Sequence, residues 1–311
     1  MIHENPLAYL LGLEGIALLR SFTGEFDQDF VDSRIAEIRK LLDDESLANA
    51  AVDVARVSTV EGYRIWSETY DGPNSAFAYD EPVLAEIVAG LPKGVALDAA
   101  CGTGRLSALL AERGHRIIGV DSSPDMLARA RERVPAGEFH LGDLSRLPVS
   151  DDAVDLIVCS LALTHVRDLK PVLAEFARVL RPGGHLVMCD IHPHWLERGA
   201  IPPVRLPDGT PGRLESHRHL VGDYLRAALP LGLRVRRCEE PTAPPGARSE
   251  PQDTPQDTPS EPTSDLGPWE LWPWSLAATV PEAAAAANAV PSVLIWHFQL
   301  TDPAPRVVNR N

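Results

Sequence analysis

Apolar residues recur along this chain with two periods, one typical of amphipathic helices and one of short buried strands. A first helix is predicted from Asn5-Pro6, which offers a cap and a first-turn proline, to about Ser21. Apolar residues then return every three or four positions and predict a second helix over about 29–43. We therefore expect residues 1–60 to form an N-terminal helical extension.

Residues 61–240 alternate short apolar segments with helical patterns. The apolar segments predict strands, and they lie at 94–98, 116–121, 139–141, 154–160, 185–189 and 233–238. This alternation is typical of an α/β fold, in which helices cover both faces of a mostly parallel sheet. We interpret residues 196–216 as an insertion.

Composition changes abruptly over residues 241–267, where Pro, Thr, Ser, Glu, Asp and Gln dominate. Such a segment cannot bury enough apolar area to offset the entropy of ordering, so it is predicted to be a disordered linker. Residues 268–311 are expected to return to the core, with a helix over 281–289 and a closing strand at 292–300.

A glycine turn follows the first predicted core strand, in the segment Val95–Arg105. Gly102 and Gly104 allow a sharp turn and a close approach of backbone to ligand, and the helix that follows directs free N–H groups there. Asp98 in this turn would repel a pyrophosphate and attract an ammonium group. Ser107 stands where a dinucleotide-binding turn has Gly or Ala, so a zwitterionic cofactor is favoured over NAD.

The turn and the segments after it resemble the motifs of the class I S-adenosylmethionine-dependent methyltransferases. The resemblance covers about residues 63–240, and its segments in family order are Val95–Arg105, Gly119–Leu127, Gly142–Leu144, Asp155–Ser160 and Leu180–Asp190. It implies a Rossmann-like, seven-stranded, mostly parallel sheet in the order 3-2-1-4-5-7-6 with an antiparallel closing strand. It also implies S-adenosyl-L-methionine as cofactor and a small-molecule acceptor.

Carboxylates at successive strand ends are the predicted cofactor ligands. The resemblance assigns the methionine part to Asp98 and the glycine turn, the ribose to Asp121 and the adenine to Asp143. An acidic residue such as Asp121 also occurs in NAD enzymes, and Asp143 could simply form a turn. The full predicted set is Tyr70, Asp98, Ala100, Gly102, Gly104, Asp121, Ser122, Met126, Gly142, Asp143, Leu144, Ser160 and Leu161.

His165 follows the predicted strand 154–160 at the edge where ligands sit in open α/β sheets. Its imidazole could take a proton from an acceptor hydroxyl or amine near neutral pH, so it is the candidate catalytic residue. The alternative is a histidine that only hydrogen-bonds the loop or the cofactor, because alignment can suffice for transfer of an activated methyl group.

Aromatic and histidine side chains are the candidates for the acceptor pocket. Tyr63, Trp66 and Tyr70 share one helix face, which serves either ordinary packing or contact with a sulfonium cation. The predicted substrate-binding residues are Tyr63, Trp66, His192, His194, His219 and Tyr224.

The histidines also raise the question of a divalent metal. His192, His194, His217, His219 and His297 could converge, but they include no His-x-x-x-His helix pair and are spread along the sequence. Polar lining of the acceptor pocket is favoured, and no metal is predicted.

The net charge and the cysteines of the chain narrow the classes of substrate and the compartment that we expect. A net charge of -15 without a clustered basic run argues against a nucleic-acid substrate. The 4 cysteines form no Cys-x-x-Cys pair, which is typical of a reduced, cytoplasmic protein.

Glu14 interrupts the apolar run Leu7–Phe22, so this run predicts a packed helix rather than a signal peptide or membrane span. The N-terminal helices are expected to form a homodimer contact or a lid, or a wall of the acceptor pocket.

Three functions stay open at this point. The leading one is methyl transfer from S-adenosyl-L-methionine to an O, N or C nucleophile of a small organic molecule. The alternatives are a nicotinamide-dependent oxidoreductase on a similar Rossmann sheet and a non-catalytic binder of an adenosyl cofactor.

Overall fold

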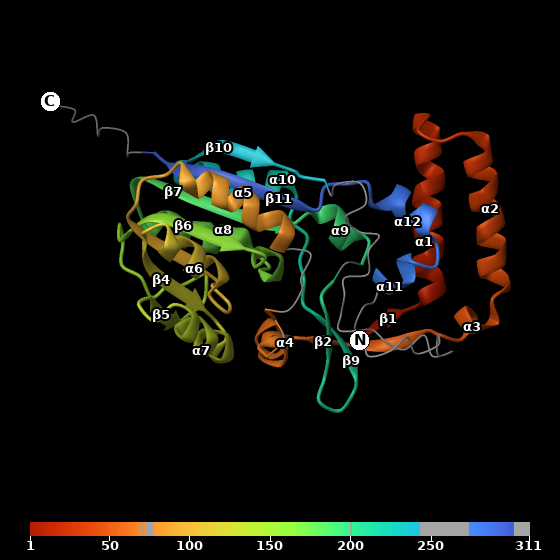
Figure 1. Ribbon diagram of the computed structural model, residues 1–311, viewed down its shortest axis with the longest axis horizontal. Helices are drawn as coiled ribbons and strands as arrows, with labels where there is room; N and C mark the ends of the chain where they lie inside the picture. Colours follow the sequence, from red (N-terminus) through yellow and green to blue (C-terminus); the bar gives the residue numbers. More distant parts are fainter. Residues whose placement is uncertain (69, 72–76, 200, 243–273, 302–311) are drawn as a thin grey trace, which may run out of the picture. The chain divides into compact units, whose positions relative to one another are not determined.

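The computed structural model describes residues 1–68, 70–71, 77–199, 201–242 and 274–301. The chain forms two compact units, each assembled from segments that are distant in sequence (Figure 1). The first unit comprises Met1–Ser58, Arg198–Glu215 and Thr242–Val290, and the second comprises Thr59–Glu197, Ser216–Pro241 and Pro291–Asn311.

A 7-stranded sheet in the order β10-β11-β7-β6-β3-β4-β5 forms the centre of the second unit. Neighbouring strands are parallel except that β11 runs antiparallel to both β7 and β10. This confirms the predicted Rossmann-like sheet and its strand order. The strands are β3 (Val95–Ala99), β4 (Arg116–Asp121), β5 (Glu138–Leu141), β6 (Val154–Ser160), β7 (Leu180–Ile191), β10 (Leu233–Glu239) and β11 (Val293–Leu300).

Helices cover both faces of this sheet. Ile157 of β6 packs with Phe176 in one apolar cluster, and its neighbour Val158 packs with Leu84 and Leu110 in another, because successive strand residues point to opposite faces. The helical elements are α4 (Thr59–Trp66), α5 (Phe77–Ala89), α6 (Arg105–Glu112), α7 (Pro124–Arg133), η2 (Leu163–His165), α8 (Leu169–Val179), α9 (Pro193–Glu197), α10 (Val221–Ala228) and η3 (Leu229–Leu231).

The first unit contains helices and a second sheet. This 4-stranded sheet has the order β1-β2-β9-β8, and its strands β2 and β9 are parallel. The elements are β1 (Ile2–Glu4), α1 (Pro6–Arg20), η1 (Ser21–Thr23), α2 (Gln28–Asp43), α3 (Glu45–Ala48), β2 (Val52–Val57), β8 (Pro203–Arg205), β9 (Pro211–Leu214), α11 (Trp274–Ala277) and α12 (Pro281–Asn288).

Several predicted boundaries differ from the structure. Residues 1–60 contain two strands besides the helices, and the expected insertion 196–216 supplies the other two strands of the same sheet. The helix at 281–288 was expected beside the closing strand in the core, but it lies in the first unit, where Ala283 and Ala287 share an apolar cluster with Leu10 of α1. Apart from residues 241 and 242, the predicted linker lies outside the described residues.

A buried ion pair explains the acidic residue in the apolar run of α1. Glu14 is fully buried, and its Oε1 lies 3.1 Å from Nη1 of Arg34 in α2. The Arg34 guanidinium also lies 5.5 Å from the centre of the Phe30 ring. Burial raises the pKa of Glu14, and the nearby guanidinium opposes this shift. A buried charge is tolerated when it is paired with an opposite charge, so the Glu14–Arg34 ion pair joins α1 to α2.

Among the helices that the structure describes, none combines the length and the apolar composition that a membrane span requires.

Asp155 near the start of β6 fastens the neighbouring strand β3. Its Oδ2 accepts a hydrogen bond from the Val95 amide at 2.7 Å, and its Oδ1 lies 2.7 Å from Nη1 of Arg181. A Cβ on Gly94 would come within 2.7 Å of Asp155 Cγ, closer than real contacts allow. Gly94 is therefore required by the approach of this carboxylate.

We predict that Gly94→Ala lowers the free energy of unfolding by about 1–3 kcal/mol, the usual cost of inserting a methyl group into packed space. Urea unfolding of the full chain measures it. Gly90→Ala is the control, because the nearest atom to its added Cβ, the Ile87 carbonyl oxygen, lies at 3.6 Å. Equal midpoints for the two variants would contradict the packing argument.

Candidate cofactor-binding site

The glycine turn joins β3 to α6 in a conformation that ordinary residues rarely adopt. Ala100, Gly102 and Gly104 have φ angles of 61, 53 and 81°. A Cβ on Gly104 would lie 3.1 Å from Ala130 of α7, so this glycine also permits close helix packing. A left-handed Ala100 carries backbone strain, which accumulates at functional sites. The structure thus brings the predicted residues of this turn together.

Asp121 at the end of β4 ties this turn to the next strand. Its Oδ2 accepts a hydrogen bond from the Gly102 amide at 2.8 Å, and its Oδ1 accepts one from the Ser123 amide at 2.8 Å. Burial raises the pKa of Asp121. A carboxylate has about four acceptor positions, so capacity for a ribose hydroxyl remains. Of the neighbouring predicted residues, Ser122 is exposed and the Met126 side chain is fully buried.

Asp98 is held inside the protein by Ser107. The Ser107 hydroxyl donates to Asp98 Oδ2 at 2.6 Å, and only 2% of Asp98 is exposed. Burial raises the pKa of Asp98 to about 6. The serine that departs from the dinucleotide-binding pattern therefore has a defined role, that of stabilising this carboxylate. The assignment of Asp98 to an ammonium group stays a prediction.

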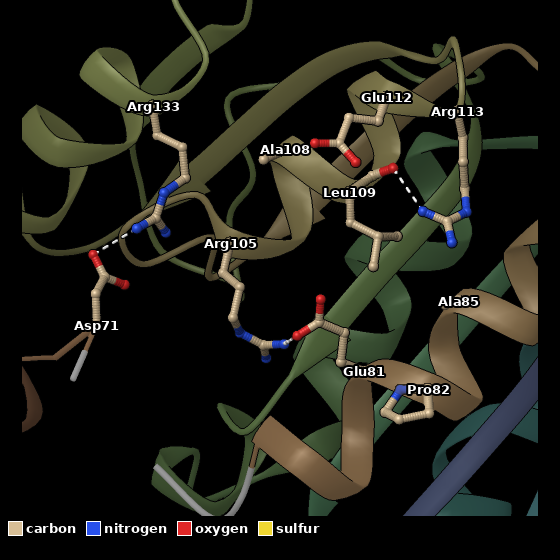
Figure 2. A pocket seen from close by; sticks show the side chains of 10 residues that line it. All are labelled: Asp71, Glu81, Pro82, Ala85, Arg105, Ala108, Leu109, Glu112, Arg113 and Arg133. Atoms are coloured by element: carbon tan, nitrogen blue, oxygen red, sulfur yellow. Dashed lines mark hydrogen bonds and ion pairs between the residues drawn. The ribbon is translucent and has the colours of Figure 1, made fainter. Parts of the chain in front are cut away.

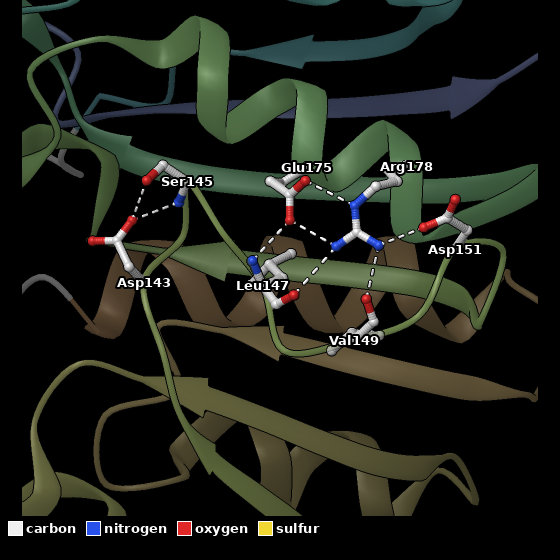
Figure 3. A network of polar contacts seen from close by, with 7 residues as sticks. All are labelled: Asp143, Ser145, Leu147, Val149, Asp151, Glu175 and Arg178. Carbon is white, nitrogen blue, oxygen red and sulfur yellow. Dashed lines mark hydrogen bonds and ion pairs between the residues drawn. The ribbon is translucent and has the colours of Figure 1, made fainter.

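Asp143 shapes the turn after β5 (Figure 3). Its Oδ1 accepts hydrogen bonds from the Ser145 amide at 2.7 Å and from the Ser145 hydroxyl. Within the described part of the chain, Asp143 Oδ2 has no hydrogen-bond partner, and the residue is exposed. Asp143 is thus a turn former through one oxygen and has the other available for a donor such as the adenine amine. Leu144 beside it packs against the core.

The end of β6 is fixed by a carboxylate that the sequence analysis missed. Asp80 of α5 is fully buried; its Oδ2 accepts from Arg105 Nη2 at 2.6 Å and from the Ser160 hydroxyl. Burial raises the pKa of Asp80. After Ser160, Leu161 has a φ of 56° and donates its amide to the Cys189 carbonyl at 2.8 Å. The available signal was an aspartate directly before Glu81-Pro82, in the first turn of a largely apolar helix.

Aromatic residues of α4 and of the turn after it lie around the candidate catalytic histidine. The Tyr63 hydroxyl and His165 Nε2 share a hydrogen bond of 3.2 Å. The Tyr63 ring meets Trp66 and Tyr70 edge-on, with centroids 5.5 and 5.7 Å apart. A Cβ on Gly102 would lie 4.0 Å from the Tyr70 ring. Burial raises the pKa of Tyr63 well above its ordinary value. The prediction of one shared helix face was wrong for Tyr70, because α4 ends at Trp66 and Tyr70 lies in the turn beyond it, where its ring approaches the glycine turn.

A second missed carboxylate, Asp190 at the end of β7, holds the loop that carries His165. Asp190 Oδ2 accepts the Thr164 amide at 2.6 Å, and Oδ1 accepts the Ile191 amide at 2.7 Å. Burial raises its pKa to about 7. The position of His165 is thus set from the neighbouring strand.

The other predicted substrate residues contact protein in the structure. His219 Nε2 lies 2.7 Å from the Val166 carbonyl oxygen, and Tyr224 is buried against Trp296. Buried His192 lies 3.2 Å from Glu240, and exposed His194 lies 3.3 Å from Glu197. Their role toward an acceptor stays a prediction. Among the described residues, no three His, Cys, Asp or Glu side chains are grouped as a metal site would need.

A pocket of about 740 Å³ borders α5 and α6 (Figure 2). Its walls carry two ion pairs, Arg105 with Glu81 at 3.2 Å and Arg133 with Asp71 at 2.6 Å. Its lining includes none of the predicted cofactor or substrate residues. We therefore place the candidate site at the strand ends, where the carboxylates and the glycine turn meet, and not in this pocket.

Comparison with known proteins finds similarity to methyltransferases. Residues 97–188 match a family model described as a methyltransferase domain. The malonyl-[acyl-carrier protein] O-methyltransferase of Hamiltonella defensa is 39% identical over 101 residues, which are 32% of this chain and 39% of that protein. The demethylmenaquinone methyltransferase of Renibacterium salmoninarum is 36% identical over 112 residues, 36% of this chain and 47% of that protein. The chain thus spans less than half of each relative's length.

A solved structure shares the fold. It is a chain of the complex between the Haloferax volcanii Trm112 methyltransferase activator and a putative methyltransferase, with a TM-score of 0.52 and 23% identity over 78% of this chain and 98% of that chain. The matched domain, its relatives and the confirmed strand order agree with one another. Residues 97–188 of the second unit match a methyltransferase domain, in keeping with the resemblance of this part of the chain to the class I S-adenosylmethionine-dependent methyltransferases.

Proposed function

We propose that this protein transfers a methyl group from S-adenosyl-L-methionine to an oxygen, nitrogen or carbon nucleophile of a small organic molecule. The observation that carries the proposal is the methyltransferase-domain match over residues 97–188, which spans the glycine turn, Asp121 and Asp143. By name, one relative methylates an oxygen of a carrier-bound malonyl group and the other acts on demethylmenaquinone, both in keeping with an acceptor that is not a nucleic acid.

The residues at the strand ends fit this cofactor. Asp121 offers acceptor capacity for the ribose, and the free Oδ2 of Asp143 offers it for the adenine amine. The Tyr70 ring lies near Gly102, and an aromatic ring can attract a sulfonium cation through its π face. When bound, the cofactor supplies a methyl group already activated on sulfur. The protein's task is then to align donor and acceptor and to exclude water.

His165 and Tyr63 would serve the acceptor. Their shared hydrogen bond orients the imidazole, and the Asp190 contacts with the Thr164 amide hold its loop. An imidazole held in this way can take the proton that an acceptor hydroxyl or amine loses on methylation. We expect Trp66, beside Tyr63, to contribute to the apolar wall of the acceptor pocket.

We also infer a cytoplasmic location and a homodimer. Cys101, Cys159 and Cys189 are buried thiols and Cys238 is an exposed one, which fits a reducing compartment. Phe22 and Leu42 of the first unit are 90% and 57% exposed, and a contact between copies through the N-terminal helices would cover them.

The first test is cofactor binding, measured by isothermal titration with S-adenosylhomocysteine. Asp121→Ala is expected to weaken affinity about 10-fold or more, because hydrogen bonds to a charged group contribute about 1.5–3 kcal/mol. Asp125→Ala removes an exposed carboxylate from the same region and should leave affinity unchanged. Binding of NADH in place of the adenosyl cofactor by the unmodified protein would contradict the proposal.

The second test concerns His165. His165→Ala is expected to lower turnover about 10²- to 10⁴-fold, the usual contribution of general acid–base catalysis, with little change in cofactor affinity. Methyl transfer to a panel of phenols, amines and enols provides the readout. Tyr63→Phe keeps the ring and removes the hydroxyl, so a smaller loss is expected.

His140→Ala is the matched control for this test, because His140 lies on β5 with Glu138 as its partner at 3.7 Å. Equal losses of turnover and cofactor affinity in His165→Ala would show that His165 serves binding rather than proton transfer.

A further inference from the structure

The segment between β5 and β6 carries Asp143 and Leu144 and is fastened at several points to α8 (Figure 3). We call residues 142–153 the adenine loop, because the proposed function assigns the adenine to it. Near its start, Gly142 packs so closely on Pro148 that an added Cβ would lie 2.8 Å from Pro148 Cδ. The loop is therefore folded back on itself.

One guanidinium fills most of its hydrogen-bonding capacity on this loop. Arg178 Nη1 donates to the Val149 carbonyl at 2.9 Å and to Asp151 Oδ1 at 2.6 Å. Its Nη2 donates to the Leu147 carbonyl at 3.2 Å and to Glu175 Oε2 at 2.7 Å. Its Nε donates to Glu175 Oε1 at 2.7 Å. These contacts match the five N–H donors of an arginine in number.

Glu175 completes the arrangement from the same helix. Its Oε2, besides accepting from Arg178, accepts the Leu147 amide at 2.8 Å. The hydrogen bond from Arg178 lowers the pKa of Glu175, so this carboxylate is charged at neutral pH. Leu147 is thus held through both its amide and its carbonyl, which fixes the path of the backbone. We call Arg178 and Glu175 the clamp.

The contribution of these ion pairs to the folding stability of the protein is too small to explain the arrangement. The Arg178 side chain is 30% exposed and Asp151 is 73% exposed, and ion pairs open to solvent contribute little to folding. The backbone adds its own contact, since the Asp152 amide donates to the Arg178 carbonyl at 3.0 Å. What the clamp determines is the conformation of one loop.

We propose that the clamp positions the adenine loop and thereby sets the selectivity of the site for adenine. This inference rests on the proposed function. Arg178 is a positioning residue in this scheme, because it bonds to the loop and to Glu175 and not to the base. Loss of its planar fork would let residues 142–149 shift, and Asp143 Oδ2 would lose its alignment with the exocyclic amine of the base.

The test compares two ligands that differ at that amine, S-adenosylhomocysteine and S-inosylhomocysteine, by isothermal titration. The unmodified protein is expected to prefer the adenosyl compound. Arg178→Lys keeps the charge without the fork and should reduce that preference about 10-fold, mainly by weakening adenosyl binding. Glu175→Gln should act in the same direction. Thermal melting of each variant confirms that it is folded.

Arg237→Lys is the matched control, because the Arg237 guanidinium bonds to Glu239 and Glu86, which lie outside the loop. It should leave the preference intact. A folded Arg178→Lys protein with the full preference would overturn the role of the clamp, as would an unmodified protein that binds both ligands equally. If the unmodified protein bound neither ligand, the proposed function itself would fail.

Discussion

The structure of the candidate site depends on the carboxylate of Asp121 and on the hydrogen bonds that it accepts from two backbone amides. One amide belongs to Gly102 of the turn after β3, and the other, from Ser123, belongs to the start of α7. Hydrogen bonds to an ionised group are short and strong, so a single side chain holds a strand end, a left-handed turn and a helix start in one geometry. The position of the ligand-facing backbone follows from it.

The same device is repeated at other strand ends. Asp98 is bonded to Ser107, Asp143 to the Ser145 amide and Asp190 to the Thr164 amide. Asp143 and Asp190 fix local backbone in this way, and Asp98 is itself held by the Ser107 hydroxyl. A site built in this way needs little rearrangement when a ligand enters, and the cost of ordering its loops is met during folding.

Much of this architecture could be predicted from the sequence, and the reasons are physical. Strands buried on both faces read as apolar runs, and glycine turns and helix caps mark where they end, so the strand order and the residues of the glycine turn could be predicted. Asp80 and Asp190 could not, because their importance lies in partners distant in sequence. The second sheet was missed for a similar reason: its strands are short, and β2 pairs with β9 far along the chain.

The assignment of α12 to the first unit has a consequence for synthesis of the protein. The apolar face of α1, with Leu10 and Ala17, is completed by Ala283 and Ala287 of α12. On a ribosome adding about 5–20 residues per second, α1 waits on the order of tens of seconds for that partner. During this interval the apolar face of α1 is uncovered, and it is a natural place for a chaperone to bind.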